Sequence, residues 1–219
     1  FRVVYYSGHS HGRYAGSAWY ADYFWEDLYE NCAVNINTDC AGCKGADDII
    51  HSIIMPETKD LAVEIVQQQT GEQFEGVRCD RLGDQSFWNV GLSSAFASFS
   101  RQKKIRLPNG TMGYARGNAE LGTGWHTPND TVDRIDPANL LRDGKIVGEY
   151  VMTCLTEPVL PLRFDRTAAD ITARLESWAQ MAGDAFDLSG TIARARELEH
   201  ACAQFPTADL TDDERNAIL

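Results

Sequence analysis

Short apolar runs alternate with stretches of helical periodicity over most of this chain. Four apolar runs have the length and composition of buried strands; they are residues 1–7, 33–38, 74–79 and 94–99. Three segments have helical spacing, two of them opened by a proline that suits a first helical turn; they are residues 17–29, 56–69 and 136–155. The run 49–55 fits either a strand or packing at a loop edge. The alternation predicts an α/β fold with a mostly parallel sheet.

The pattern changes after Glu157. Pro158 and Pro161 mark a linker, and apolar residues then recur at helical spacing over 171–182 and 192–205. These segments predict a helical hairpin, which needs the main domain or a partner to cover its apolar stripes. The chain therefore divides into an α/β domain, residues 1–161, and a helical hairpin with an acidic tail, residues 162–219.

Composition limits the possible partners. The net charge of −12 argues against binding to nucleic acid or to an anionic membrane. No apolar run reaches the roughly 20 residues that span a bilayer, and no signal peptide precedes the first run. We expect a soluble protein, with the cytoplasm favoured as its compartment. Because Phe1 already belongs to a strand-like run, we expect the chain to be a piece of a longer polypeptide.

Polar residues of metal-binding type lie where the predicted strands end and in the long loop before the last large helix. They belong to three segments, residues 8–12, 37–39 and 125–131. His11, Asp39 and His126 are the ligand types that zinc takes in proteins. In an open parallel sheet, sites gather beyond the carboxyl ends of the strands, so these side chains are expected to converge.

The order of these segments resembles the zinc exopeptidase family of aminopeptidase Y, glutamate carboxypeptidase II and the transferrin receptor. In that family a Gly-Ala-Glu-Glu loop ending in Gly-Ser follows one strand; here Gly-His-Ser-His stands at 8–11, with Gly-Ser at 16–17. The family's Asn-x-Asp matches 37–39. Its Ser-Asp-His-x-x-Phe segment is similar to 83–87. The last ligand segment, Tyr-His-Thr-x-x-Asp-Thr, closely matches 125–131.

The resemblance covers residues 1–157 and implies a fold and an activity. The fold would be a three-layer sandwich with a mostly parallel sheet, and the activity a metal-dependent exopeptidase acting on peptide or amino-acyl amide bonds through a metal-activated water. The implied cofactor is one or two zinc ions held by His11, Asp39 and His126. Asp84 and Asp130 would orient the site.

Two residues next to the first loop are candidates for substrate binding. Arg13 and Tyr14 could meet a substrate carboxylate or an oxyanion. This expectation rests on their position in the sequence.

The chain also departs from the family. Ser10 stands where the general-base glutamate is expected, and a hydroxyl cannot act as a base near neutral pH. The family's earlier ligands, a His-x-Asp pair and a bridging aspartate, have no counterpart before Phe1. Two functions follow: a metallo-exopeptidase, or a catalytically inactive relative or fragment that serves as a binding or assembly module. In either case the C-terminal helices are expected to support a homodimer.

The six cysteines leave their pairing open. Cys40 and Cys43 have the spacing of a redox or zinc pair, but no second pair completes a zinc site. From the sequence we expect them to be small buried or loop residues.

Overall fold

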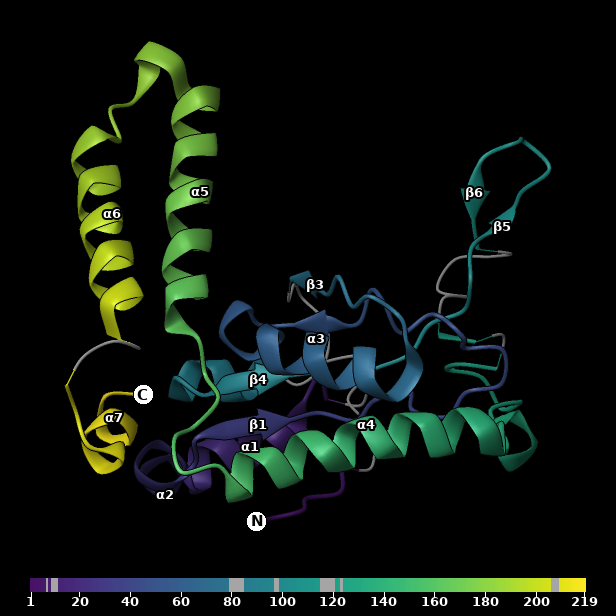
Figure 1. Ribbon diagram of the computed structural model, residues 1–219. Coiled ribbons are helices and arrows are strands. Elements are labelled where there is room, and N and C mark those ends of the chain that lie inside the picture. The colour runs from purple at the N-terminus through teal and green to yellow at the C-terminus, as the bar shows by residue number, and fades with distance from the viewer. Residues whose placement is uncertain are drawn as a thin grey trace.

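Two pairs of parallel strands lie at the centre of the first part of the chain (Figure 1). Strand β1 (Val34–Ile36) pairs with β4 (Ser93–Ala95), and β2 (Ile53–Ile54) pairs with β3 (Val77–Arg78). A backbone hydrogen bond of 3.3 Å from Met55 N to the Ser94 carbonyl joins the two pairs. The computed structural model describes residues 1–6, 8, 12–78, 85–96, 99–114, 121–122, 124–205 and 209–219.

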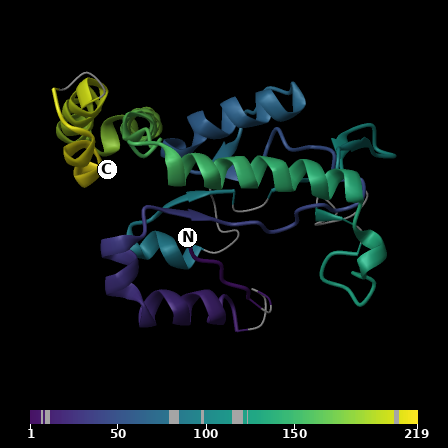
Figure 2. The same cartoon turned by 60° about the horizontal axis from the view of Figure 1, so that its bottom comes forward.

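Helices cover both faces of the β1–β4 pair, as Figure 2 shows. Helices α3 (Pro56–Thr70) and α4 (Pro137–Thr156) lie on one face. Helices α1 (Ala15–Tyr23) and α2 (Trp25–Asn31) lie on the other, next to the 3-10 helix η1 (Gln85–Val90). The fold is therefore mixed helix and sheet with small parallel sheets, as the alternating pattern predicts.

The larger hydrophobic core lies between the strands and the pair α3 and α4. Phe96, Ile146 and Tyr150 are fully buried in it, and the Tyr150 hydroxyl donates a hydrogen bond to the Thr58 carbonyl (3.0 Å). A smaller core, centred on Leu28, packs α1 and α2 against η1. Burial of these side chains stabilises each helix layer through the removal of apolar surface from water.

The helices α3 and α4 begin where the sequence predicts. Proline occupies the first turn of both, and the Asp136 carboxylate caps α4 by accepting from the backbone N–H groups of Ala138 and Asn139. A side-chain cap satisfies N–H groups that have no partner within the helix. Gly71 ends α3 in the left-handed conformation that favours glycine.

Two sequence expectations for the domain are wrong. Residues 1–6 form no strand, and Phe1 and Tyr5 are strongly exposed, because an apolar run becomes a strand only with a paired neighbour. The predicted helix 17–29 is interrupted at Phe24, and Trp19 and Trp25 on it are exposed. The polar stretch after Arg101 contains a β-hairpin that the pattern does not reveal.

That hairpin consists of β5 (Ile105–Arg106) and β6 (Met112–Gly113), which pair antiparallel. It projects from the domain at the end opposite the C-terminal helices (Figure 1). A short 3-10 helix, η3 (Val132–Arg134), then leads into α4.

The C-terminal helical hairpin is present and packs largely on itself. Its helices are α5 (Phe164–Ala182) and α6 (Ser189–Gln204), joined through the 3-10 helix η4 (Gly183–Ala185). The acidic tail is helical over part of its length. It forms α7 (Asp212–Ile218), where Thr211 and Glu214 make a capping box.

The base of this hairpin is fixed to the α/β part of the chain by charged and polar contacts. Asp60 on α3 pairs with Arg163 (3.3 Å) and Arg166 (3.0 Å), and the buried Glu57 accepts a hydrogen bond of 2.6 Å from Thr167. Further along α5, the apolar stripe over residues 171–182 is not fully covered as we expected, because Trp178 is 56% exposed. Helices long and apolar enough to cross a membrane are absent from the described parts of the chain.

Candidate functional site

Asp39 lies three residues beyond the end of β1, as the sequence predicts. Its side chain is half-buried, and its backbone carbonyl accepts a hydrogen bond from Phe99 N (3.0 Å) in the segment that follows β4. The next residue is held by the same segment, because Ser100 Oγ donates to the Cys40 carbonyl (3.1 Å). The ends of two adjacent parallel strands therefore fix the position of Asp39.

The turn that follows Asp39 pairs with the segment that leads into α4. Lys44 N donates to the Arg134 carbonyl (2.7 Å), Asp136 N donates to the Gly42 carbonyl (2.9 Å), and Cys43 forms an antiparallel bridge with Ile135. This short ladder joins the Asp39 loop to the chain directly after the 125–131 segment, so the two candidate segments are neighbours.

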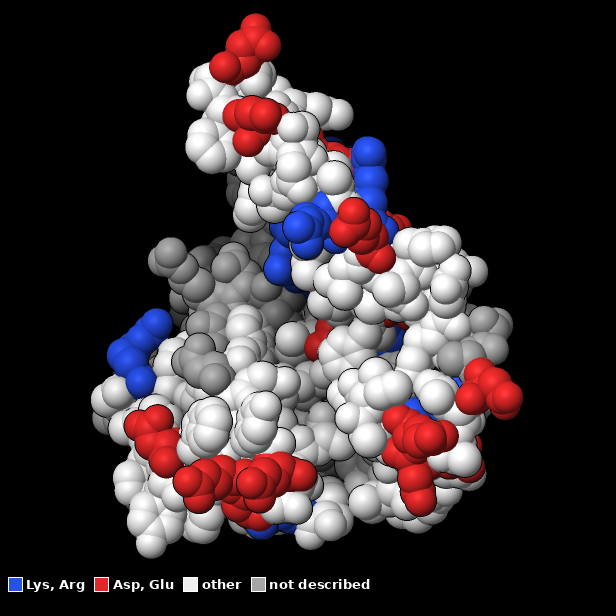
Figure 3. Space-filling view, turned by 90° about the vertical axis from the view of Figure 1, so that its left-hand side faces the viewer, with Lys and Arg blue, Asp and Glu red and all other residues white. Residues whose placement is uncertain are grey.

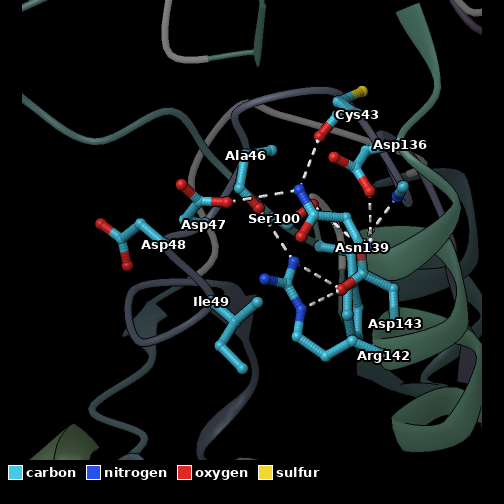
Figure 4. A network of polar contacts seen from close by, with 12 residues as sticks. Cys43, Ala46, Asp47, Asp48, Ile49, Ser100, Asp136, Asn139, Arg142 and Asp143 are labelled. Atoms are coloured by element: carbon cyan, nitrogen blue, oxygen red, sulfur yellow. Dashed lines mark hydrogen bonds and ion pairs between the residues drawn. The ribbon is translucent and has the colours of Figure 1, made fainter.

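A buried carboxylate on α4 holds the turn from below (Figure 4). Asp143 is fully buried, and its Oδ2 accepts from Gly42 N (2.8 Å) and from Ser100 Oγ (3.0 Å). Its Oδ1 pairs with the Arg142 guanidinium (2.7 Å), which also donates to the Ala46 carbonyl. The carboxylate therefore has a cationic partner in Arg142 and hydrogen-bond donors in Gly42 N and Ser100 Oγ, and these contacts compensate for its burial.

The 125–131 segment forms consecutive tight turns. Thr127 N donates to the Gly124 carbonyl (3.0 Å) and Asp130 N donates to the Thr127 carbonyl (3.1 Å). Glycine is favoured at 124, because a Cβ there would lie 3.0 Å from the Asn129 carbonyl oxygen. His126 is exposed at the surface of these turns, and its ring stacks on Trp125 with centroids 3.5 Å apart.

Backbone strain coincides with the candidate loops. Five non-glycine residues in the described ranges have positive φ, and four of them belong to the candidate segments or their immediate neighbours. They are Arg13, Tyr14, Cys40 and His126. Such conformations cost free energy and persist only where the surrounding structure fixes them, which is why they cluster at functional sites.

Arg13 and Tyr14 lie at the start of α1. The Tyr14 carbonyl accepts from Ala18 N (2.8 Å), and the Arg13 guanidinium lies over the Tyr14 ring at 5.2 Å. Ser17 on the same helix is buried and makes a 3.0 Å hydrogen bond with Ser86 of η1. This contact connects the beginning of α1 to the chain that follows the candidate residue Asp84.

The electrostatics of the Asp39 turn centre on its two thiols. A hydrogen bond from Cys40 lowers the pKa of Cys43, while burial and the carboxylates of Asp130, Asp39 and Asp143 act in the opposite direction. The same hydrogen bond, together with burial, raises the pKa of Cys40.

The described site residues lie on two parts of the chain. Asp39 precedes residues 42–44, which are hydrogen-bonded to residues 134–136, and His126 and Asp130 lie in the turns before that second segment. The predicted ligand His11, the base position Ser10 and the orienting residue Asp84 lie outside the described residues. Within the described ranges, no group of three or more His, Cys, Asp or Glu side chains is close enough to hold a metal ion.

Sequence reasoning missed the residues that shape the turn. Asp143 and Ser100 belong to no motif, and their types are common on helices and strand ends. One signal was available for Asp143: it lies on the same face of α4 as Ile146 and Tyr150, three and seven residues later, where the pattern predicts burial. A carboxylate at such a position requires partners.

Comparison with known proteins gives no match, either to a protein-family profile or to a curated protein.

We expect Asp143→Ala to lower the free energy of unfolding by about 3 kcal/mol, because it leaves the Arg142 charge and Gly42 N without the carboxylate that they bind. Asp143→Asn keeps the side-chain volume and one acceptor, so its effect should be smaller. Chemical denaturation followed by tryptophan fluorescence measures both. Asp184→Ala, at an exposed aspartate, is the matched control; an equal loss in all three variants would contradict the role given to Asp143.

Proposed function

We propose that this chain carries part of a metal-dependent exopeptidase site of the zinc aminopeptidase type. The observation that supports the proposal most is the short backbone ladder between residues 42–44 and 134–136, which makes the Asp39 loop and the 125–131 turns neighbours. The motif order in the sequence requires this adjacency, and Asp39 follows a parallel strand as such a site demands. The substrate class is a peptide or amino-acyl amide.

The layered architecture of this family is part of the proposal. The hydrogen bond between Met55 and Ser94 would continue the parallel pairs into one sheet in the order β1, β4, β2, β3. Helices on both faces of the β1–β4 pair support the proposal of a three-layer sandwich (Figure 2).

The donor chemistry suits zinc. Carboxylate and imidazole are zinc ligands, and Asp39 and His126 supply one of each, with His11 proposed as the third. A bound zinc ion would supply an activated water and polarise a substrate carbonyl. Asp130 and Asp84 would not bind the metal themselves. Asp130 would orient the 125–131 segment, and Asp84 would orient the segment before η1. Arg13, exposed beside Tyr14, offers a cation to a substrate carboxylate.

We expect the purified protein to bind zinc, and His126→Ala and Asp39→Asn to weaken binding by more than about 100-fold, since even loss of a group that only orients a ligand costs 10–100-fold. Equilibrium dialysis followed by elemental analysis measures the bound metal. His200→Ala removes an exposed histidine on α6 and is the control. Undiminished zinc binding by both site variants would show that these residues do not form a metal site.

A second function, an inactive binding or assembly module, is favoured by one observation. Ser10 stands at the position of the general base, and a serine hydroxyl cannot take a proton from water near neutral pH. In this form of the proposal the site retains ligand binding, and hydrolysis is lost.

We expect little or no hydrolysis of amino-acyl anilides by this chain, even with added zinc. Loss of a positioned base costs about 10²–10⁴-fold in rate. A steady-state assay with and without zinc tests this, with His126→Ala as the control for contaminating peptidase. Zinc-dependent turnover that disappears in His126→Ala would contradict the expectation and establish the enzyme.

The proposed partner is a second copy of the chain, bound through the C-terminal hairpin. Trp178, Met181 and Phe186 are exposed on it, at 56%, 82% and 65%. Figure 3 shows uncharged surface on the hairpin between its acidic tip and the basic side chains nearer its base. Apolar surface of this kind is typical of contacts between proteins.

We therefore expect a homodimer in solution, and we expect Trp178→Glu to shift it towards monomer, since burial of such a side chain is worth roughly 1.5–3 kcal/mol. Light scattering during size-exclusion chromatography gives the mass. Leu141→Glu places the same charge at an exposed leucine of α4 and is the control. A wild-type chain that is monomeric at high concentration would refute the dimer.

A further inference from the structure

The two cysteines that follow Asp39 are held face to face. Cys40 has φ of +61° and Gly42 φ of +75°, so two left-handed residues lie in the short turn that carries both cysteines. The Cys40 thiol lies in hydrogen-bond contact with the sulfur of Cys43 and, at 3.3 Å, with Asp39 Oδ1. Spacing alone does not determine such a contact; the backbone of the turn does.

The surrounding structure fixes this turn on every side. Asp143 accepts from Gly42 N, Ser100 donates to the Cys40 carbonyl, and Cys43 is paired with Ile135. Gly42 cannot carry a side chain, since a Cβ would lie 2.8 Å from the side chain of Leu140. A fixed turn holds the thiols together before any reaction, which lowers the entropic cost of joining them.

Side-chain contacts distinguish this pair from Cys32 and Cys154, which are half-buried as well. Cys40 and Cys43 are both half-buried, so a small reagent can reach them from the side of the loop. By contrast, Cys32 donates to the Val34 carbonyl (3.8 Å), and Cys154 packs against the larger core.

We propose that Cys40 and Cys43 are a redox-modification site and form a reversible disulfide with a small-molecule disulfide such as glutathione disulfide as oxidant. The Cys43 thiolate attacks one sulfur of the oxidant, which breaks its S–S bond and releases one glutathione as the thiol. Cys40 then gives its proton to solvent and attacks the Cys43 sulfur, releasing the second glutathione. Two protein thiols are oxidised and one glutathione disulfide is reduced to two thiols.

The reaction changes the surroundings of Asp39. Once Cys40 is part of a disulfide it has no S–H group, so Asp39 Oδ1 loses a hydrogen-bond donor. Oxidation would therefore alter the carboxylate at the end of β1, whether or not that carboxylate binds a metal.

The test is a titration with glutathione and glutathione disulfide in the presence of a metal chelator, followed by alkylation of the remaining thiols and peptide mass spectrometry. The chelator separates this result from the zinc proposal. We expect the wild-type chain to lose two alkylated thiols, both in the peptide that contains residues 40–43, and to regain them on reduction. Cys40→Ser should instead trap glutathione on Cys43, while Cys202→Ser should behave as wild type.

Three outcomes would overturn the proposal. Both cysteines could remain alkylated throughout the titration; either could pair with a different cysteine; or each could carry glutathione in the wild-type chain without closing the disulfide. The wild-type measurement decides each of these outcomes without the variants, so a variant that fails to fold leaves the test intact.

Discussion

The carboxylate of Asp143 is the interaction on which the candidate site depends. It lies on α4 with no exposed surface, and it binds the turn after β1 through Gly42 N and the end of the β4 segment through Ser100. An ionised carboxylate in the interior is costly unless it is paired and fully hydrogen-bonded. Here Arg142 supplies the charge and the turn supplies the donors, so helix, turn and strand end are kept in one arrangement.

This arrangement explains why strained backbone persists around it. Cys40 and His126 have left-handed conformations that an unsupported loop would leave. The turn that contains Cys40 is held by Ser100, Asp143 and Ile135. The turns around His126 are closed by their own hydrogen bonds and by a close approach of the backbone at Gly124. Hydrogen bonds therefore hold both the loop after β1, which carries a carboxylate and two thiols, and the turns that carry His126.

The helical hairpin depends on a different interaction. Asp60 and Glu57 at the start of α3 fix the first turn of α5, and Asp170 further along α5 pairs with Arg78 of β3 (3.3 Å). The main packing partner of α5 is α6 (Figure 1). Apolar side chains on the projecting part remain open to solvent. The candidate site therefore lies at the strand ends, away from the exposed part of the helical hairpin. This separation fits the proposal that binding and dimerisation use different surfaces.

The sequence by itself determined the local elements whose causes are local. A proline in the first turn, an aspartate cap and a helical period predict α3 and α4, and short apolar runs predict the central strands, because these signals act within a few residues. It also placed Asp39 after a strand and His126 in a tight loop. The strand expected at 1–7 is not formed in the described residues 1–6, because a strand requires a paired neighbour. The apolar stripe that contains Trp178 was expected to be covered, but its burial depends on tertiary packing, which the sequence pattern does not specify.

Only the tertiary structure decided which loops meet and what holds them. Asp143 is about a hundred residues from Gly42, and no spacing rule connects them, because their contact is made by packing α4 against the strands. The same holds for the thiol pair: its sequence spacing is common and uninformative, and its orientation follows from a left-handed turn fixed by distant residues. Local sequence preferences therefore determine where helices and strands form, and long-range burial and hydrogen bonding determine how the loops of the candidate site are arranged.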